Sequence, residues 1–252
     1  MNITIGLLGL LIGSFLNVVI YRVPRGESIV TPGSHCPACG HALRAWELIP
    51  VISFLIQKRQ CSSCQARISW RYPAVELLTG ILFFLTASLS FDFGLHPARL
   101  LLNLYFVAML VALAFIDLDT FRLPDVLTLP LLGTGLLGAF LIPGNPSGWE
   151  SVLSALGAGG LFWIIARIYP QGMGLGDVKL VAAMGAYLGF PGIFLSVFVG
   201  SFVGAFLGIV LLFVGRKRFR QQIPFGPYLA LGAILTLLWG ARIFDLYWAW
   251  IR

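Results

Sequence analysis

Two acidic sites in this chain lie where hydrophobic runs begin or end. Asp177 follows three glycines at alternate positions in the segment 172–179 and directly precedes an apolar run. Asp117, Asp119 and Asp125 form the other site, at the end of an earlier run. A carboxylate at the depth of lipid is costly and therefore usually functional. A partly desolvated carboxyl group is also suited to acid–base chemistry.

The two sites can act together only if they meet. Asp117 lies nearest its apolar run and is expected to be the most desolvated of its cluster, whereas Asp119 is expected in a loop and Asp125 at a helix start. Two adjacent carboxyl groups share one proton and can activate water against a peptide carbonyl, so Asp117 and Asp177 predict aspartic-protease chemistry. The alternative is a proton-coupled membrane transporter that uses the same two aspartates as a relay. Lys179 is expected to tune Asp177, to bind a carbonyl, or simply to extend its ammonium to the membrane surface.

All four cysteines belong to two CxxC pairs, which are Cys36 with Cys39 and Cys61 with Cys64. This spacing is that of a tetrahedral zinc site. Two disulfides are one alternative, which a cytoplasmic location disfavours. A redox CxxC is another, which the presence of two such pairs at this spacing disfavours. Four thiolates close the coordination sphere, so the zinc is expected to be structural. The apolar segment 46–55 between the pairs is too short to span a membrane and is expected to lie on its surface.

Hydrophobic runs must position these sites. The chain is 58% hydrophobic and 11% charged, whereas soluble domains are about 25% charged. The apolar runs are 3–20, 74–90, 97–116, 126–142, 151–168, 178–190, 193–215 and 228–250. Most reach the roughly 17–25 residues that a spanning helix needs, although 178–190 must borrow residues from the glycine-rich segment, tilt, or thin the bilayer locally.

These runs predict an all-α polytopic membrane protein with about eight transmembrane helices. The expected parts are a first transmembrane helix (1–20), a small cytoplasmic zinc-binding domain with the four cysteines (21–72) and a transmembrane core (73–252). With eight spans, 14 of the 17 lysines and arginines fall on one side. The excess assigns that side to the cytoplasm and places both termini outside.

The net charge of +7 is therefore explained by topology, and no nucleic-acid partner is expected. Membrane lipids are expected partners, because the basic segment 216–220 suits contact with anionic headgroups. The first run has no basic segment before it and is expected to be a retained anchor rather than a cleaved signal.

The motifs together resemble those of the type IV prepilin leader peptidases, which are GxGD intramembrane aspartyl proteases. The resemblance rests on 115–119 with 123–125, on 172–179, and in the N-terminal half on 13–17, the four-cysteine loop and 71–73 with Glu76. It implies that Asp117 and Asp177 are catalytic and that the four cysteines hold zinc.

The resemblance also implies a substrate, a location and a second activity. Such enzymes cleave the basic leader from prepilins and pseudopilins of type IV pili and type II secretion, at the cytoplasmic face of the bacterial inner membrane. They then methylate the new N-terminal residue with S-adenosylmethionine. No glycine-rich strand–helix fingerprint for that cofactor is present, so methylation rests on the resemblance. The candidate residues around the cofactor are Phe15, Asn17, Glu27 and Glu76.

Overall fold

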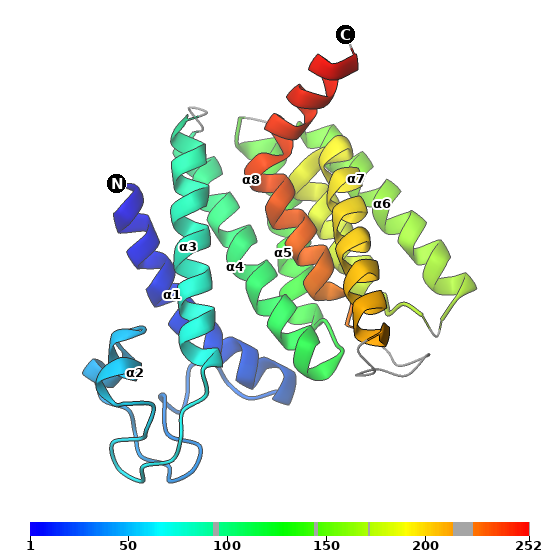
Figure 1. The fold of residues 1–252 in the computed structure, drawn as a ribbon. Helices are drawn as coiled ribbons and strands as arrows, with labels where there is room; N and C mark the ends of the chain where they lie inside the picture. The colour runs from blue at the N-terminus through cyan, green and yellow to red at the C-terminus, as the bar shows by residue number, and fades with distance from the viewer. Residues whose placement is uncertain (93–95, 144–145, 171, 214–223, 252) are drawn as a thin grey trace. The chain divides into compact units, whose positions relative to one another are not determined.

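The computed structural model describes residues 1–92, 96–143, 146–170, 172–213 and 224–251. Helices dominate these residues (Figure 1). Their β-type pairings are two isolated bridges, His35 with Ala42 and Gln60 with Arg67. The elements are α1 (Asn2–Arg22), the 3-10 helices η1 (Val23–Arg25) and η2 (Ala45–Leu48), α2 (Ile52–Ile56), α3 (Arg71–Asp92), α4 (Pro97–Thr120), α5 (Asp125–Leu141), α6 (Gly148–Ile168), α7 (Leu175–Phe213) and α8 (Gly226–Ile251). They form two compact units, Met1–Phe93 and Gly94–Arg252. The three-part division expected from the sequence remains a prediction.

Unit 1 is built on α1 and α3, which lie side by side because glycines let their backbones approach (Figure 1). A Cβ atom at Gly9 would lie 2.7 Å from Phe83 Cβ, and one at Gly13 would lie 2.7 Å from Glu76 Cα. Small residues at such contacts are typical of helices that pack within a membrane. The loop between the two helices carries the four cysteines together with η1, η2 and α2.

Unit 2 contains α4 to α8, and α4 is the helix most enclosed by its neighbours. Phe106, Leu110 and Leu113 of α4 are fully buried. The ring of Phe106 stacks on that of Tyr187 of α7, with 4.2 Å between the ring centroids. This stacking connects α4 to α7 within unit 2.

α7 consists of two helices that meet at Gly189. This glycine has φ 69° and ψ −178°, which interrupts the helical geometry two residues before Pro191. Before the break, Gly185 lies against Ser154 of α6, and after it Gly200 lies against Tyr228 at the start of α8. The two halves therefore run in opposite directions, and the second returns beside α8 (Figure 1).

The expected number of membrane helices is confirmed. Six described helices are long and apolar enough to cross a membrane. α5 has 17 residues and is slightly shorter, and counting α7 as two spans brings the total to about eight. The short predicted run 178–190 gains its extra length at its start, because α7 begins at Leu175. The basic segment 216–220, expected to contact lipid, lies outside the described residues.

One local expectation was wrong, because Asp119 lies in the last turn of α4 and not in a loop. The helix continues to Thr120, whose hydroxyl donates to the carbonyl of Ile116 over 2.9 Å. It ends where Phe121 adopts a left-handed conformation with φ 53°. A left-handed residue of this kind is a common end of a helix, and a charge in the last turn does not prevent the helix from continuing.

Candidate functional site

Asp177 lies in the first turn of α7, directly after the glycine-rich segment. Its Oδ2 accepts a hydrogen bond from the backbone N–H of Gly174 over 3.2 Å. The first N–H groups of a helix have no partner within the helix, and a carboxylate of the first turn often accepts from one near it. One carboxyl oxygen of Asp177 is therefore held by its own segment.

Close packing against Leu123 explains why the residue immediately before Asp177 is a glycine, Gly176. A Cβ atom at Gly176 would lie 2.9 Å from Leu123 Cβ and 3.4 Å from the backbone nitrogen and oxygen of Leu123. The start of α7 therefore packs against the backbone of the loop that joins α4 to α5. This loop begins directly after the end of α4, where Asp117 is located.

Asp117 is buried in the last turns of α4, with 5% of its surface exposed. Its Oδ2 accepts a hydrogen bond from the backbone N–H of Gly226 over 2.9 Å. Gly226 is the first residue of α8, and a Cβ atom there would lie 2.8 Å from Asp117 Oδ2. The start of α8 thus fits against Asp117 only because residue 226 is glycine.

The structure brings the two predicted aspartates to the same end of unit 2. The end of α4, the start of α7 and the start of α8 meet there through the contacts of Asp117, Gly176 and Gly226. The carboxyl groups of Asp117 and Asp177 each have Oδ2 held by a glycine N–H. Both aspartates were predicted from the sequence, but no role was predicted for Gly226. Its only local signal was its position between Pro224 and Pro227, which mark the start of the last helix.

Lys179 pairs with Asp125 rather than with Asp177. Its Nζ lies 2.6 Å from Asp125 Oδ1, and this contact joins the first turn of α7 to the first turn of α5. The side chains are 35% and 58% exposed, respectively, so the pair contributes only about 0.2–1 kcal/mol to stability. Asp125 also suits the start of α5, where a negative charge is favoured by the helix dipole.

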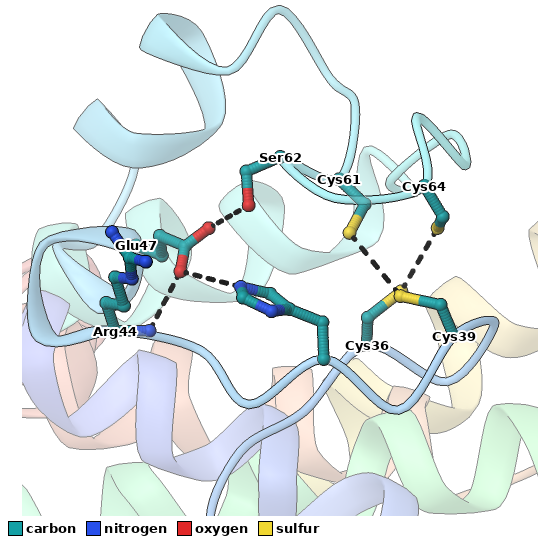
Figure 2. Close-up of polar contacts among 8 residues, drawn as sticks. Cys36, Cys39, Arg44, Glu47, Cys61, Ser62 and Cys64 are labelled. Carbon is teal, nitrogen blue, oxygen red and sulfur yellow. Dashed lines mark hydrogen bonds and ion pairs between the residues drawn. The ribbon is translucent and has the colours of Figure 1, made fainter.

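The four cysteines of unit 1 form a second site (Figure 2). Their Sγ atoms all lie within 4.8 Å of one another. Cys36 and Cys64 Sγ are 3.9 Å apart, and Cys39 and Cys61 Sγ are 4.0 Å apart. A tetrahedral zinc ion with Zn–S bonds of about 2.3 Å needs sulfur atoms about 3.8 Å apart. The thiolate set and its spacing therefore fit zinc.

Each cysteine pair lies on a tight turn of the same design. The N–H of Cys36 donates to the carbonyl of His41, and the N–H of Cys61 donates to that of Ala66, both over 2.9 Å. In the second turn, the backbone N–H groups of Cys64 and then Ser63 lower the pKa of the Cys61 thiol to about 6.

Glu47 connects the two turns, and nothing in the sequence pattern distinguished it. Its buried carboxylate accepts from the backbone N–H of Arg44 over 2.8 Å and from the Ser62 hydroxyl (Figure 2). His41 Nε2 lies 3.5 Å away. The N–H of Arg44, followed by the hydroxyl of Ser62, lowers the pKa of the Glu47 carboxyl group. Because Ser62 stands between two ligands and His41 follows the first pair, Glu47 fixes the turns relative to each other.

The four cofactor candidates lie in unit 1 in different environments. The side-chain amide of Asn17 donates to the carbonyl of Tyr72 over 3.1 Å, and Glu76 accepts from the N–H of Val51 over 2.8 Å. Glu27 and Phe15 are exposed. Asn17 and Glu76 therefore have a structural explanation in the contact between α1, α3 and the cysteine loop. Their role toward S-adenosylmethionine stays a prediction.

Comparisons with known proteins agree with this division into two units. A profile of the bacterial peptidase A24 N-terminal domain matches residues 7–90, and one of the type IV leader peptidase family matches residues 104–209. The chain is 40% identical to a prepilin leader peptidase/N-methyltransferase of Aeromonas salmonicida, over 94% of this chain and 90% of that protein. Proteins with the same name from Pseudomonas aeruginosa (38% identical, 96% and 91% covered) and Neisseria gonorrhoeae (42% identical, 72% of each covered) are also similar. No solved structure matches the chain.

Proposed function

Because the chain belongs to the type IV leader peptidase family, we propose that it removes the leader from prepilins or pseudopilins through Asp117 and Asp177. As a member of this family it is an aspartic-type peptidase with N-methyltransferase activity. The second activity methylates the N terminus that cleavage exposes. The rival reading, a proton-coupled transporter, has no comparable support.

The observation that carries the proposal is the convergence of the two aspartates at one end of unit 2. Each carboxyl group is oriented by a glycine N–H. We infer that the two carboxyl groups share one proton at rest. This is the protonation state from which an aspartic protease starts.

Hydrolysis follows from that state. The ionised aspartate accepts a proton from a water molecule as its oxygen attacks the scissile carbonyl carbon, and the protonated aspartate hydrogen-bonds the carbonyl oxygen. Proton transfer to the leaving nitrogen then breaks the C–N bond, which gives one carboxylate and one amine. The hydrogen bonds from Gly174 and Gly226 each occupy Oδ2, so each Oδ1 remains for this chemistry.

We place this end of unit 2 at the cytoplasmic face of the inner membrane, with both termini on the other side. The basis is the distribution of 14 of 17 lysines and arginines on the side that includes both acidic sites. A prepilin has a basic leader followed by an apolar helix, so its scissile bond lies where lipid meets cytoplasm. The location proposed for the two aspartates corresponds to that level.

The cysteines would hold a structural zinc ion, which cross-links the two turns of the loop. The methyl group transferred to the new N terminus comes from S-adenosylmethionine. Phe15, Asn17, Glu27 and Glu76 stay the candidate residues around that cofactor.

The test is cleavage of a prepilin by purified, zinc-loaded enzyme with S-adenosylmethionine, read by intact mass. Asp117→Asn and Asp177→Asn should each abolish leader removal. Asp119→Asn is the matched control, because this exposed acid lies in the same helix two residues away from Asp117, and it should cleave normally. A folded Asp117→Asn or Asp177→Asn enzyme with full activity would remove the proposed pair.

A further inference from the structure

The segment 46–56 between the cysteine turns has an apolar surface without an exposed charge. Its one charged residue, Glu47, is buried against the cysteine turns. Ile52, Leu55 and Ile56 of α2 are 54%, 62% and 67% exposed, and Trp46, Leu48 and Ile49 are also exposed. Exposed apolar side chains concentrated in one short segment are unfavourable in water.

A hydrogen bond sets the depth of this segment relative to the membrane helices. The N–H of Val51, the residue before α2, donates to Glu76 Oε2 over 2.8 Å. Glu76 lies five residues inside α3, which is about 7.5 Å from the start of that helix. On α1, Glu76 contacts Gly13. Gly13 lies about 13 Å along the helix from Arg22, the first basic residue of the chain. Val51 is therefore deeper than the charges at the ends of both spans.

The backbone of the segment is suited to a medium without water. The N–H groups of Ser53 and Leu55 donate to the carbonyls of Ile49 and Val51, both over 3.1 Å. The N–H of Val51 would otherwise lack a partner, and Glu76 supplies one. Backbone groups at this depth must be satisfied by the protein itself. The same bond explains why a carboxylate is buried one turn inside α3.

Basic and aromatic residues flank the segment. Arg44 precedes it and Lys58 and Arg59 follow it. The guanidinium carbon of Arg59 lies 5.3 Å from the centre of the Trp70 ring, and that ring lies 4.9 Å from the ring of Phe54 in α2. Tryptophan and basic residues are enriched where a protein passes from hydrocarbon to headgroups.

We propose that residues 46–56 are a monotopic membrane anchor, immersed in the cytoplasmic leaflet and in contact with anionic phospholipid. The depth of about 5–10 Å typical of such segments agrees with the position of Val51. The basic residues at both ends attract the anionic headgroups, and the apolar residues of α2 enter the acyl region. The anchor holds the zinc turns against the membrane surface independently of any catalytic role of Asp117 and Asp177.

The test is photo-crosslinking of the full-length, zinc-loaded enzyme in nanodiscs that contain phosphatidylglycerol and phosphatidylcholine. A benzoylphenylalanine probe replaces Leu55, and a second enzyme carries it at Ile56 in case one position folds poorly. The control carries the probe at Ala42, an exposed residue of the first cysteine turn. Intact mass then shows whether a lipid has been added.

We expect phospholipid adducts at Leu55 and Ile56 to exceed those at Ala42 several-fold. Lys58→Glu in the Leu55 probe enzyme should reduce the phosphatidylglycerol share of the adducts, because it removes a charge that attracts the headgroups. Two results would overturn the proposal. One is that the probes at Leu55 and Ile56 crosslink to protein, either to the same chain or to a second copy. The other is that their lipid adducts are no more frequent than those at Ala42.

Discussion

Replacing Gly176 with alanine tests whether the packing of α7 on Leu123 positions Asp177. The new Cβ atom would lie 2.9 Å from Leu123 Cβ, whereas carbon atoms in contact are about 3.5–4.0 Å apart. The start of α7 must therefore retreat by roughly 0.5–1 Å. Such overpacking costs about 1–3 kcal/mol of stability. A displacement of about 1 Å at a catalytic group lowers the rate on the order of a hundredfold.

We therefore expect Gly176→Ala to lower kcat for prepilin cleavage by about ten- to a hundredfold. KM should change little, because the substitution moves a catalytic group without removing a binding surface. The assay is the initial rate of leader removal by purified enzyme, with thermal unfolding and zinc content measured on the same samples.

Gly160→Ala in α6 is the matched control, because a Cβ atom there has no neighbour within 4 Å. It should retain the wild-type rate. Adding Leu123→Gly to Gly176→Ala removes the nearest clashing atom and should restore part of kcat. If Gly176→Ala cleaves at the wild-type rate, the contact with Leu123 does not position Asp177 and the argument fails.

Three further predictions follow from contacts at the two sites. Gly226→Ala should lower kcat by about tenfold or more, because its Cβ atom would lie 2.8 Å from Asp117 Oδ2; cleavage rates of the folded enzyme check this. A double-mutant cycle with Lys179→Met and Asp125→Asn, measured by chemical unfolding, should give a coupling of about 0.2–1 kcal/mol that falls as salt is added, because the pair is exposed; a larger, salt-independent coupling would contradict the exposed geometry. Gln65→Gly should slow zinc loss to a chelator and stabilise the cysteine loop by up to about 1 kcal/mol, because Gln65 has φ 62° at the position where the first turn has glycine; faster zinc loss would show that its side chain makes a stabilising contact.

The features predicted correctly from the sequence depend on residues that are close to one another along the chain. The two CxxC pairs placed four sulfur atoms within 4.8 Å of one another. The apolar runs predicted about eight helices. They also predicted the interruption of α7, because the short run 178–190 and the run 193–215 are separate in the sequence. Placing Asp117 and Asp177 at ends of apolar runs on the same side predicted that they lie at one end of the bundle, and their catalytic pairing stays a prediction.

The features missed were contacts between distant residues. Gly226 is 109 positions from Asp117, and Lys179 is 54 positions from Asp125. No local pattern reports such distances, because several packed helices determine them together. Glu47 was missed for a related reason. A lone glutamate in an apolar stretch gives no sign that its carboxylate joins two turns.

The hydrogen bond between Gly226 and Asp117 has a consequence for biogenesis. Asp117 enters the membrane with α4, whereas its donor belongs to the last helix and is synthesised 109 residues later. A ribosome-bound chain that has inserted only α4 to α7 therefore has both aspartates but lacks a group that orients one of them. The complete geometry forms only when α8 joins the bundle. If Asp117 acts as proposed, we expect leader cleavage only after insertion is finished, and truncated products from interrupted synthesis should not cleave.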